Sequence, residues 1–76
     1  MHLNLGIAYY KLDQHDDSIE EFKQEIRIES DMGDAHYFLS LVYLDKGEKE
    51  LSLDEYKILK KINEELANKL FESIYK

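Results

Sequence analysis

Apolar residues recur at three- and four-residue intervals along most of the chain, with polar and charged residues between them. The clearest members of this pattern are Ile19, Phe22, Ile26, Ala35, Leu39 and Val42. Such spacing gathers apolar side chains on one face of an α-helix, whereas a half-buried strand would alternate at every second residue. We therefore predict an all-α fold built from amphipathic helices.

The periodic stretches divide into helices that are joined by short turns. We expect about five helices, over residues 1–12, 16–29, 34–46, 49–62 and 64–75. Asp13 and Gly47 follow helix ends, where a left-handed residue commonly closes the last turn. Ser30 and Asp31 offer capping oxygens before the third helix, and Asn63 offers one before the fifth. Turns this short predict that consecutive helices pack as antiparallel neighbours.

The chain resembles itself when it is shifted so that His2 falls on His36. This offset matches the period of ~34 residues found in one class of helical repeat array. Identical residues then coincide at many positions. They are His2 with His36, Leu5 with Leu39, Tyr9 with Tyr43, Ser18 with Ser52, Glu21 with Glu55, Lys23 with Lys57 and Ile28 with Ile62. We interpret the two segments as copies of one helix-turn-helix unit that pack their side chains in the same way.

Slim and bulky residues follow a fixed order in both units, because two helices cross closely only where one of them is slim. In the first unit they are Leu5, Gly6, Tyr9, Ser18, Phe22 and Ile28, and in the second Leu39, Ser40, Tyr43, Gly47, Ser52 and Tyr56. This order resembles the signature of the tetratricopeptide repeat family over nearly the whole chain. The sequence departs from the family at Glu25 and Leu59, where a small residue is usual, and at Ser30 and Glu64, where proline is common. These departures predict altered packing at both junctions between units.

The resemblance implies a single α-solenoid domain over residues 1–76. A first unit covers residues 1–32 and begins inside its first helix, a second covers residues 33–63, and a capping helix covers residues 64–76. The capping helix has an apolar stripe on one side and polar residues on the other, as a terminal solvating helix requires. Two units are fewer than the roughly three usually needed for stability, which favours a longer array or a second copy that covers the open end.

The first helix of each unit carries a second apolar stripe that its own hairpin does not need. Its members are Leu3, Ile7, Tyr10, Tyr37, Leu41 and Leu44. The resemblance implies that they line a concave groove that binds a protein or peptide partner, with Asp34 and Asp45 as rim residues that favour a basic partner. Two simpler interpretations stay open. The apolar side chains would then pack first helix against first helix, and the two acids would mark a helix start and solvated surface.

The function expected from this surface is a non-catalytic protein-protein interaction module that binds a peptide or helix in an apolar groove. The alternative is a homo-oligomerisation element, such as a homodimer, or a fragment of a longer repeat scaffold. A net charge of −7 without a basic stripe repels phosphate backbones and anionic lipid. We therefore expect neither nucleic acid nor membrane as a partner.

Motifs for chemistry are missing from the sequence. It has no cysteine, no glycine-rich phosphate loop and no HExxH, so we predict neither an enzyme nor a bound cofactor or metal. His2 and His36 hold equivalent positions without a ligand one turn away, which favours core filling over metal binding. Residues 1–12 lack the features of a signal peptide, and no stretch has the ~20 apolar residues of a membrane span. The expected protein is soluble and cytoplasmic.

Overall fold

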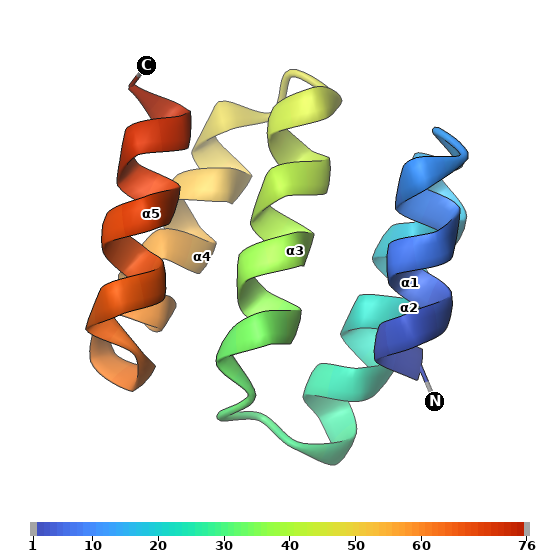
Figure 1. The fold of residues 1–76 in the computed structure, drawn as a ribbon, viewed down its shortest axis with the longest axis horizontal. Helices are drawn as coiled ribbons and strands as arrows, with labels where there is room; N and C mark the ends of the chain where they lie inside the picture. The colour runs from blue at the N-terminus through green and yellow to red at the C-terminus, as the bar shows by residue number, and fades with distance from the viewer. Residues whose placement is uncertain (1, 76) are drawn as a thin grey trace.

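The computed structural model describes residues 2–75 and contains five α-helices in that range. They are α1 (His2–Lys11), α2 (His15–Ile28), α3 (Gly33–Asp45), α4 (Lys49–Ile62) and α5 (Glu64–Ile74), shown in Figure 1. The predicted all-α fold is confirmed, and the predicted helix ends differ from the observed ones by at most one residue. The outer limits predicted at residues 1 and 76 lie outside the described residues.

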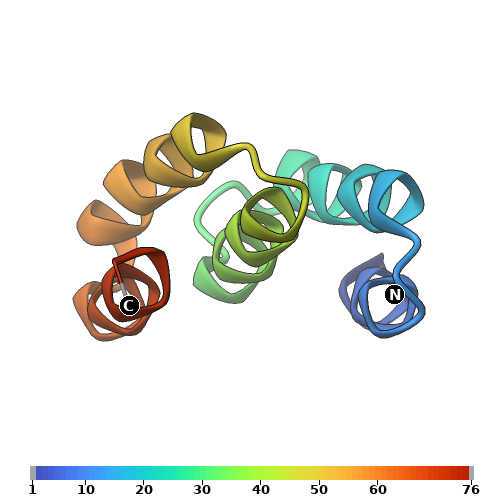
Figure 2. The ribbon, with the colours of Figure 1, turned by 90° about the horizontal axis from the view of Figure 1, so that it is seen from above.

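The helices form two antiparallel hairpins, α1 with α2 and α3 with α4, and α5 packs against α4 and α3. Seen from above, α1, α3 and α5 lie on one side of a curved arrangement and α2 and α4 on the other, as Figure 2 shows. Helix α3 contacts all four of the other helices, whereas α1 meets α3 only sparsely. The middle helix therefore joins the two hairpins.

The two hairpin turns have the same backbone geometry at equivalent positions of the two units. Asp13 has φ 61° and Gly47 has φ 79°, so each occupies the left-handed conformation that the sequence predicts for it. The amide of Gln14 donates to the carbonyl of Tyr9 at 2.9 Å, and the amide of Glu48 donates to that of Tyr43 at 2.8 Å. Asparagine, aspartate and glycine tolerate this conformation best, which explains the residue types at the two turns.

The helix caps agree with the sequence at one start and disagree at another. Asn63 caps α5, since its side-chain oxygen accepts from the amide of Leu66 at 3.1 Å. Ser30 and Asp31 do not cap α3, because Met32 holds the N-cap position and no side chain bonds there. The carbonyl of Ser30 instead accepts a hydrogen bond from His36, so this turn is tied to the interior of the second unit.

Within each hairpin, the helices approach closest at slim residues. Ser18 donates through its hydroxyl to the carbonyl of Gly6 at 2.7 Å, and Ser40 donates to the carbonyl of Ser52 at 3.0 Å. All three serines are fully buried. A Cβ added to Gly6 would lie 2.7 Å from a ring carbon of Phe22, which is too close for any real contact. The predicted slim residues Gly6, Ser18, Ser40 and Ser52 therefore lie at the helix crossings, whereas Ala8, another slim residue expected at such a contact, is exposed.

Two hydrophobic clusters hold the hairpins together, one on each side of α3. The first consists of Phe22, Leu39, Val42 and Tyr43, and the second of Leu59, Ala67, Leu70 and Ile74. Leu59 fills the junction with α5, whereas its counterpart Glu25 leaves a carboxylate-bearing side chain only 5% exposed at the other junction. The two junctions are thus packed differently from each other.

We expect Ser52→Leu to lower the free energy of unfolding by about 1–3 kcal/mol, because the larger side chain overpacks the crossing of α3 and α4. Ser73→Leu is the matched control, since Ser73 is exposed on α5. Urea unfolding followed by circular dichroism measures both variants. Equal midpoints for Ser52→Leu and the unmodified chain would contradict this account of the crossing.

Candidate functional site

The six predicted groove residues belong to α1 and α3, and all six are half-buried. Leu3, Ile7 and Tyr10 pack against the first hydrophobic cluster. Tyr37, Leu41 and Leu44 pack against the second cluster, towards α5. Each stripe therefore takes part in the packing between helices, and only the remaining surface of these side chains faces solvent. The groove itself stays a prediction.

Tyr10 of α1 and Asp45 of α3 approach each other. We call the side of the molecule on which these two helices lie the inner side (Figure 2). Burial raises the pKa of Tyr10 above its ordinary value of 10.0, and the neighbouring carboxylate of Asp45 raises it further. Tyr37 and Asp13 add smaller contributions in the same direction. The structure thus brings the predicted groove residue Tyr10 close to the predicted rim residue Asp45.

The other predicted rim residue, Asp34, does not take part in this contact. Asp34 is exposed in the first turn of α3, where a carboxylate interacts favourably with the positive end of the helix. That position fits the interpretation of Asp34 as a helix-start residue. Asp45 is exposed at the opposite end of the same helix and faces Tyr10.

Three aromatic rings, those of Phe22, Phe38 and Tyr37, contact one another in turn. Phe22 of α2 and Phe38 of α3 stack with their ring centroids 6.0 Å apart and an interplanar angle of 12°. Phe38 then meets the neighbouring Tyr37 edge to face, at 5.5 Å and 74°. Phe38 is half-buried, and it is the residue through which Tyr37 is connected to the hydrophobic interior of the first junction.

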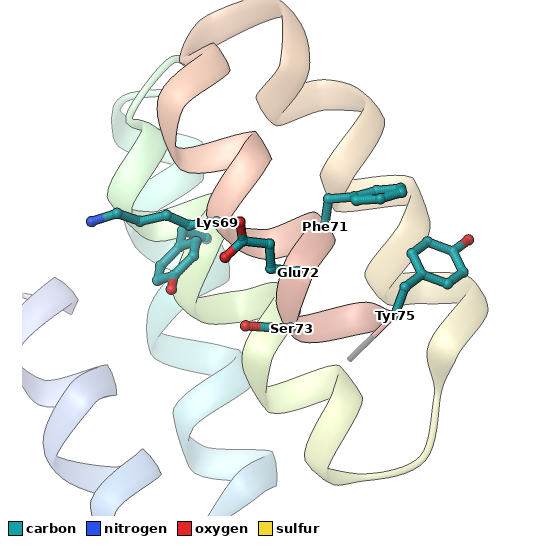
Figure 3. A pocket seen from close by; sticks show the side chains of 6 residues that line it. Lys69, Phe71, Glu72, Ser73 and Tyr75 are labelled. Atoms are coloured by element: carbon teal, nitrogen blue, oxygen red, sulfur yellow. The ribbon is translucent and has the colours of Figure 1, made fainter.

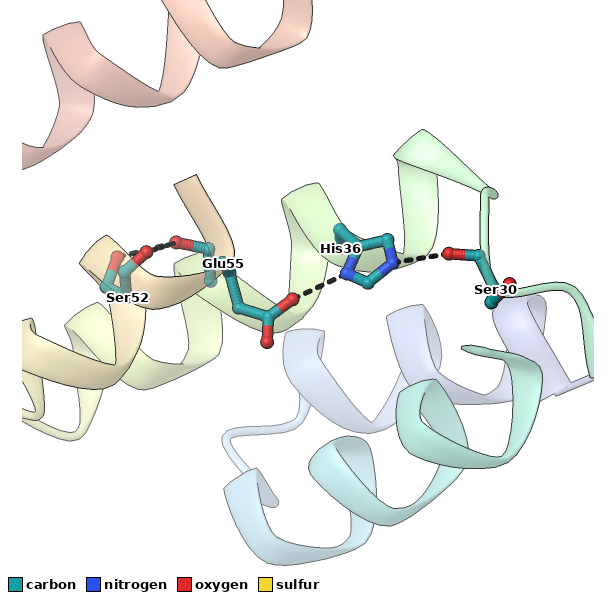
Figure 4. A network of polar contacts seen from close by, with 5 residues as sticks. Ser30, His36, Ser52 and Glu55 are labelled. Atoms are coloured by element: carbon teal, nitrogen blue, oxygen red, sulfur yellow. Dashed lines mark hydrogen bonds and ion pairs between the residues drawn. The ribbon is translucent and has the colours of Figure 1, made fainter. Parts of the chain in front are cut away.

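Each unit contains one histidine paired with a carboxylate of its own second helix. His2 Nδ1 lies 2.7 Å from Glu21 Oε1, and His36 Nδ1 lies 2.6 Å from Glu55 Oε1 (Figure 4). His36 Nε2 also donates to the carbonyl of Ser30 at 2.8 Å. The His36 side chain is 5% exposed, so it fills the interior as the sequence predicts. Within residues 2–75, no three metal-binding side chains converge on one point.

Aromatic residues at the end of α5 form a feature that the sequence interpretation did not single out as a surface. Phe71 is 46% exposed and Tyr75 is 53% exposed, with their ring centroids 4.8 Å apart. Tyr56 lies 5.8 Å from Phe71, and Lys49 Nζ lies 4.6 Å from the centre of the Tyr75 ring. The sequence could have indicated this feature, because Phe71 and Tyr75 are four residues apart and therefore lie on one side of a helix end.

A hollow borders α5 and is lined by Tyr37, Lys69, Phe71, Glu72, Ser73 and Tyr75. Figure 3 shows that Phe71 and Tyr75 point to one side of α5, whereas Lys69 and Glu72 lie on the other. The lining residues therefore do not converge on one point where a ligand would be held. They place aromatic surface and mixed charge around the last helix.

We expect Asp45→Asn to lower the pKa of Tyr10 towards its ordinary value, because a nearby negative charge is removed. Tyr10 keeps its proton to higher pH in the folded chain than in the unfolded chain. Stability is therefore retained below about pH 10 and decreases as the pH rises through the folded pKa. Tyrosinate absorbance as a function of pH measures the titration, with Tyr10→Phe identifying its contribution. Asp34→Asn is the control and should leave the titration unchanged. If both substitutions changed the titration equally, Asp45 would have no specific effect on the pKa of Tyr10.

No helix within residues 2–75 combines the length and the apolar character needed to cross a bilayer. Comparison of the sequence with models of known protein families gives no match. Comparison with curated proteins gives no match either.

Proposed function

We propose that this chain is a non-catalytic protein-interaction module of the tetratricopeptide type, which holds a peptide or helix against the inner side of α1 and α3. The observation that carries the proposal is the approach of Tyr10 of α1 to Asp45 of α3. It brings a phenol and a carboxylate from the first helices of the two hairpins together. Aromatic residues flanked by polar groups are common anchors in protein interfaces.

The repeated contacts support the family proposal. The turn bonds, the crossings at slim residues and the histidine-carboxylate pairs recur at equivalent positions of the two units. They include backbone bonds, side-chain-to-backbone bonds and side-chain pairs, and they involve different elements in each unit. A chain in which only the helices repeated would not reproduce them.

The two histidine-carboxylate pairs have a structural role, which favours a function without catalysis. His2 with Glu21, and His36 with Glu55, join the first helix of each hairpin to the second. His36 has both ring nitrogens engaged and is buried. General acid-base chemistry needs such a group within hydrogen-bond reach of a substrate, so this placement supports binding rather than turnover.

The chemistry of the surface suggests the kind of partner and a moderate affinity. Half-buried apolar side chains leave little area to cover, and burying roughly 200 Å² would yield about 5 kcal/mol before ordering costs. The acids Asp34 and Asp45 favour a partner with a basic residue next to its apolar side chains. We propose a short amphipathic or extended segment bound with micromolar or weaker affinity.

Peptides selected by display against the whole chain test this proposal. We expect the Kd of a selected peptide to increase at least about tenfold in the double variant Ile7→Lys with Leu41→Lys, because two charges would enter the apolar surface. Leu51→Lys with Ile58→Lys is the matched control, since Leu51 and Ile58 are 41% and 42% exposed on α4. Circular dichroism verifies that each variant is folded.

Chemical-shift mapping by NMR supplies an independent criterion. Amides of α1 and α3 should shift when the peptide is added, whereas those on the solvent face of α4 should not. Selected peptides that shift α4 instead, or that bind the Ile7 and Leu41 variant as well as the control, would rule out the inner side as the binding surface.

A further inference from the structure

The outer side of α1 forms a second surface, which we call the end face. It is a shallow hollow lined by His2, Asn4, Leu5, Ala8 and Glu21. Leu5 is 45% exposed and Ala8 is exposed, although both lie in the middle of a helix. Isolated exposed leucines are common, so the end face needs a further observation before it indicates a binding site.

That observation comes from the equivalent positions of the second unit, on α3. Leu39 corresponds to Leu5 and is 2% exposed, and Val42 corresponds to Ala8 and is fully buried. Both belong to the cluster that includes Phe22 of α2. Equivalent faces therefore occur on α3, where α2 covers the face, and on α1, where the face is open within residues 2–75.

The polar groups also differ between the covered face on α3 and the open face on α1. His2 and His36 each present Nδ1 to a glutamate of their own hairpin. His36 Nε2 donates to the carbonyl of Ser30, which follows the end of α2. His2 Nε2 has no partner within residues 2–75, and the His2 side chain is 41% exposed against 5% for His36. The ring nitrogen that bonds to a carbonyl on the covered face is thus exposed on the open face.

We propose that the end face is a docking surface for the second helix of a partner hairpin built like α1 and α2. An aromatic ring at the position of Phe22 packs on Leu5 and Ala8, with aliphatic residues one turn away on either side, as Ile19 and Ile26 are arranged around Phe22. The helix ends in a turn with a free carbonyl, which accepts from His2 Nε2. The contact reproduces the interface between α2 and α3. The partner helix is therefore recognised by its shape, by one aromatic ring and by one hydrogen bond.

The two faces differ at two equivalent positions, and these differences indicate which residues the partner helix carries. Lys46, at the end of α3, pairs with Asp16 of α2 at 2.9 Å, but its counterpart in the first unit is Leu12, which is 65% exposed. The partner helix therefore carries an apolar residue instead of an acid in its first turn. Asn4 replaces Phe38, so the partner ring meets an amide where Phe22 stacks on a ring.

A second copy of this chain does not supply such a helix. The apolar side of α2 is covered by α3, and the apolar side of α4 is covered by α5. Docking through either helix would require the chain to open one of its own clusters. The net charge of −7 adds repulsion between copies. The occupant is therefore a different hairpin with its second helix uncovered.

A tethered hairpin tests the proposal with a defined probe. Residues 1–34 are added directly before residue 1, so that the added copy of α2 precedes His2 by the same stretch of chain that separates α2 from His36. We expect hydrogen exchange of the original α1 amides to slow by at least about tenfold, because the added helix covers the end face. Asp16→Leu in the added copy should slow it further, since Leu12 then meets an apolar residue.

Leu5→Asp in the original copy separates docking from a general effect of chain length. It should leave the single chain nearly unchanged and abolish the slower exchange in the extended chain. Leu51→Asp is the control, because Leu51 is exposed to a similar degree on α4 and should preserve the effect. Unchanged α1 exchange in the extended chain, or slower exchange that survives Leu5→Asp, overturns the proposal.

Analytical ultracentrifugation of the single chain adds one decisive outcome. We expect a monomer, and a dimer that Leu5→Asp dissociates would overturn the proposal in favour of a second copy as the occupant. These measurements do not involve the inner side of α1 and α3. A failure of peptide binding at Ile7 and Leu41 therefore leaves the end face untouched, and the reverse also holds.

Discussion

The close crossing of the two helices in each hairpin is the constraint on which the rest of the structure depends. Gly6 lets the ring of Phe22 lie against the backbone of α1, and the hydroxyl of Ser18 bonds to the carbonyl of the same glycine. Ser40 and Ser52 fulfil the same requirement in the second hairpin. Since interiors are close-packed, the position of Phe22 fixes where α3 can lie, and the angle between hairpins follows from it. The curvature seen in Figure 2 is therefore set inside the hairpins.

Helix α3 carries this constraint from one half of the molecule to the other. It contributes Leu39, Val42 and Tyr43 to the first cluster, while Tyr37, Leu41 and Leu44 pack against the second. A helix that buries residues on most of its circumference is apolar nearly all round, which explains the second stripe in the sequence. The inner surface is consequently the edge of two cores, and a partner that moves Tyr37 or Leu41 would act on the packing of α5.

The sequence predicts the features that depend on local chemistry. Helix ends, the left-handed residues Asp13 and Gly47, the Asn63 cap and the equivalence of His2 and His36 follow from residue type and a fixed spacing. Features that depend on how deeply a side chain is buried did not follow. The periodic pattern identifies a second stripe but does not say how much of it the neighbouring hairpin covers, and it gives no sign that Tyr10 meets Asp45. The capping role expected of Ser30 was wrong because Met32 holds the N-cap position and the Ser30 carbonyl bonds to buried His36.

The inner side and the end face differ in physical character, and this difference suggests how they would divide binding. Side chains of the inner side already stabilise the fold with part of their surface, so a partner gains only what remains and is bound weakly. The end face shares Leu5 and His2 with the interior junction, where the equivalents Leu39 and His36 are buried, although Asn4 stands where that junction has Phe38. A partner there gains the full burial of Leu5 and Ala8 but has to match one helix geometry, because the template on α3 admits one arrangement of ring and carbonyl. Selectivity is therefore expected at the end face and tolerance at the inner side, since rigid complementarity discriminates between partners and a shallow apolar surface does not.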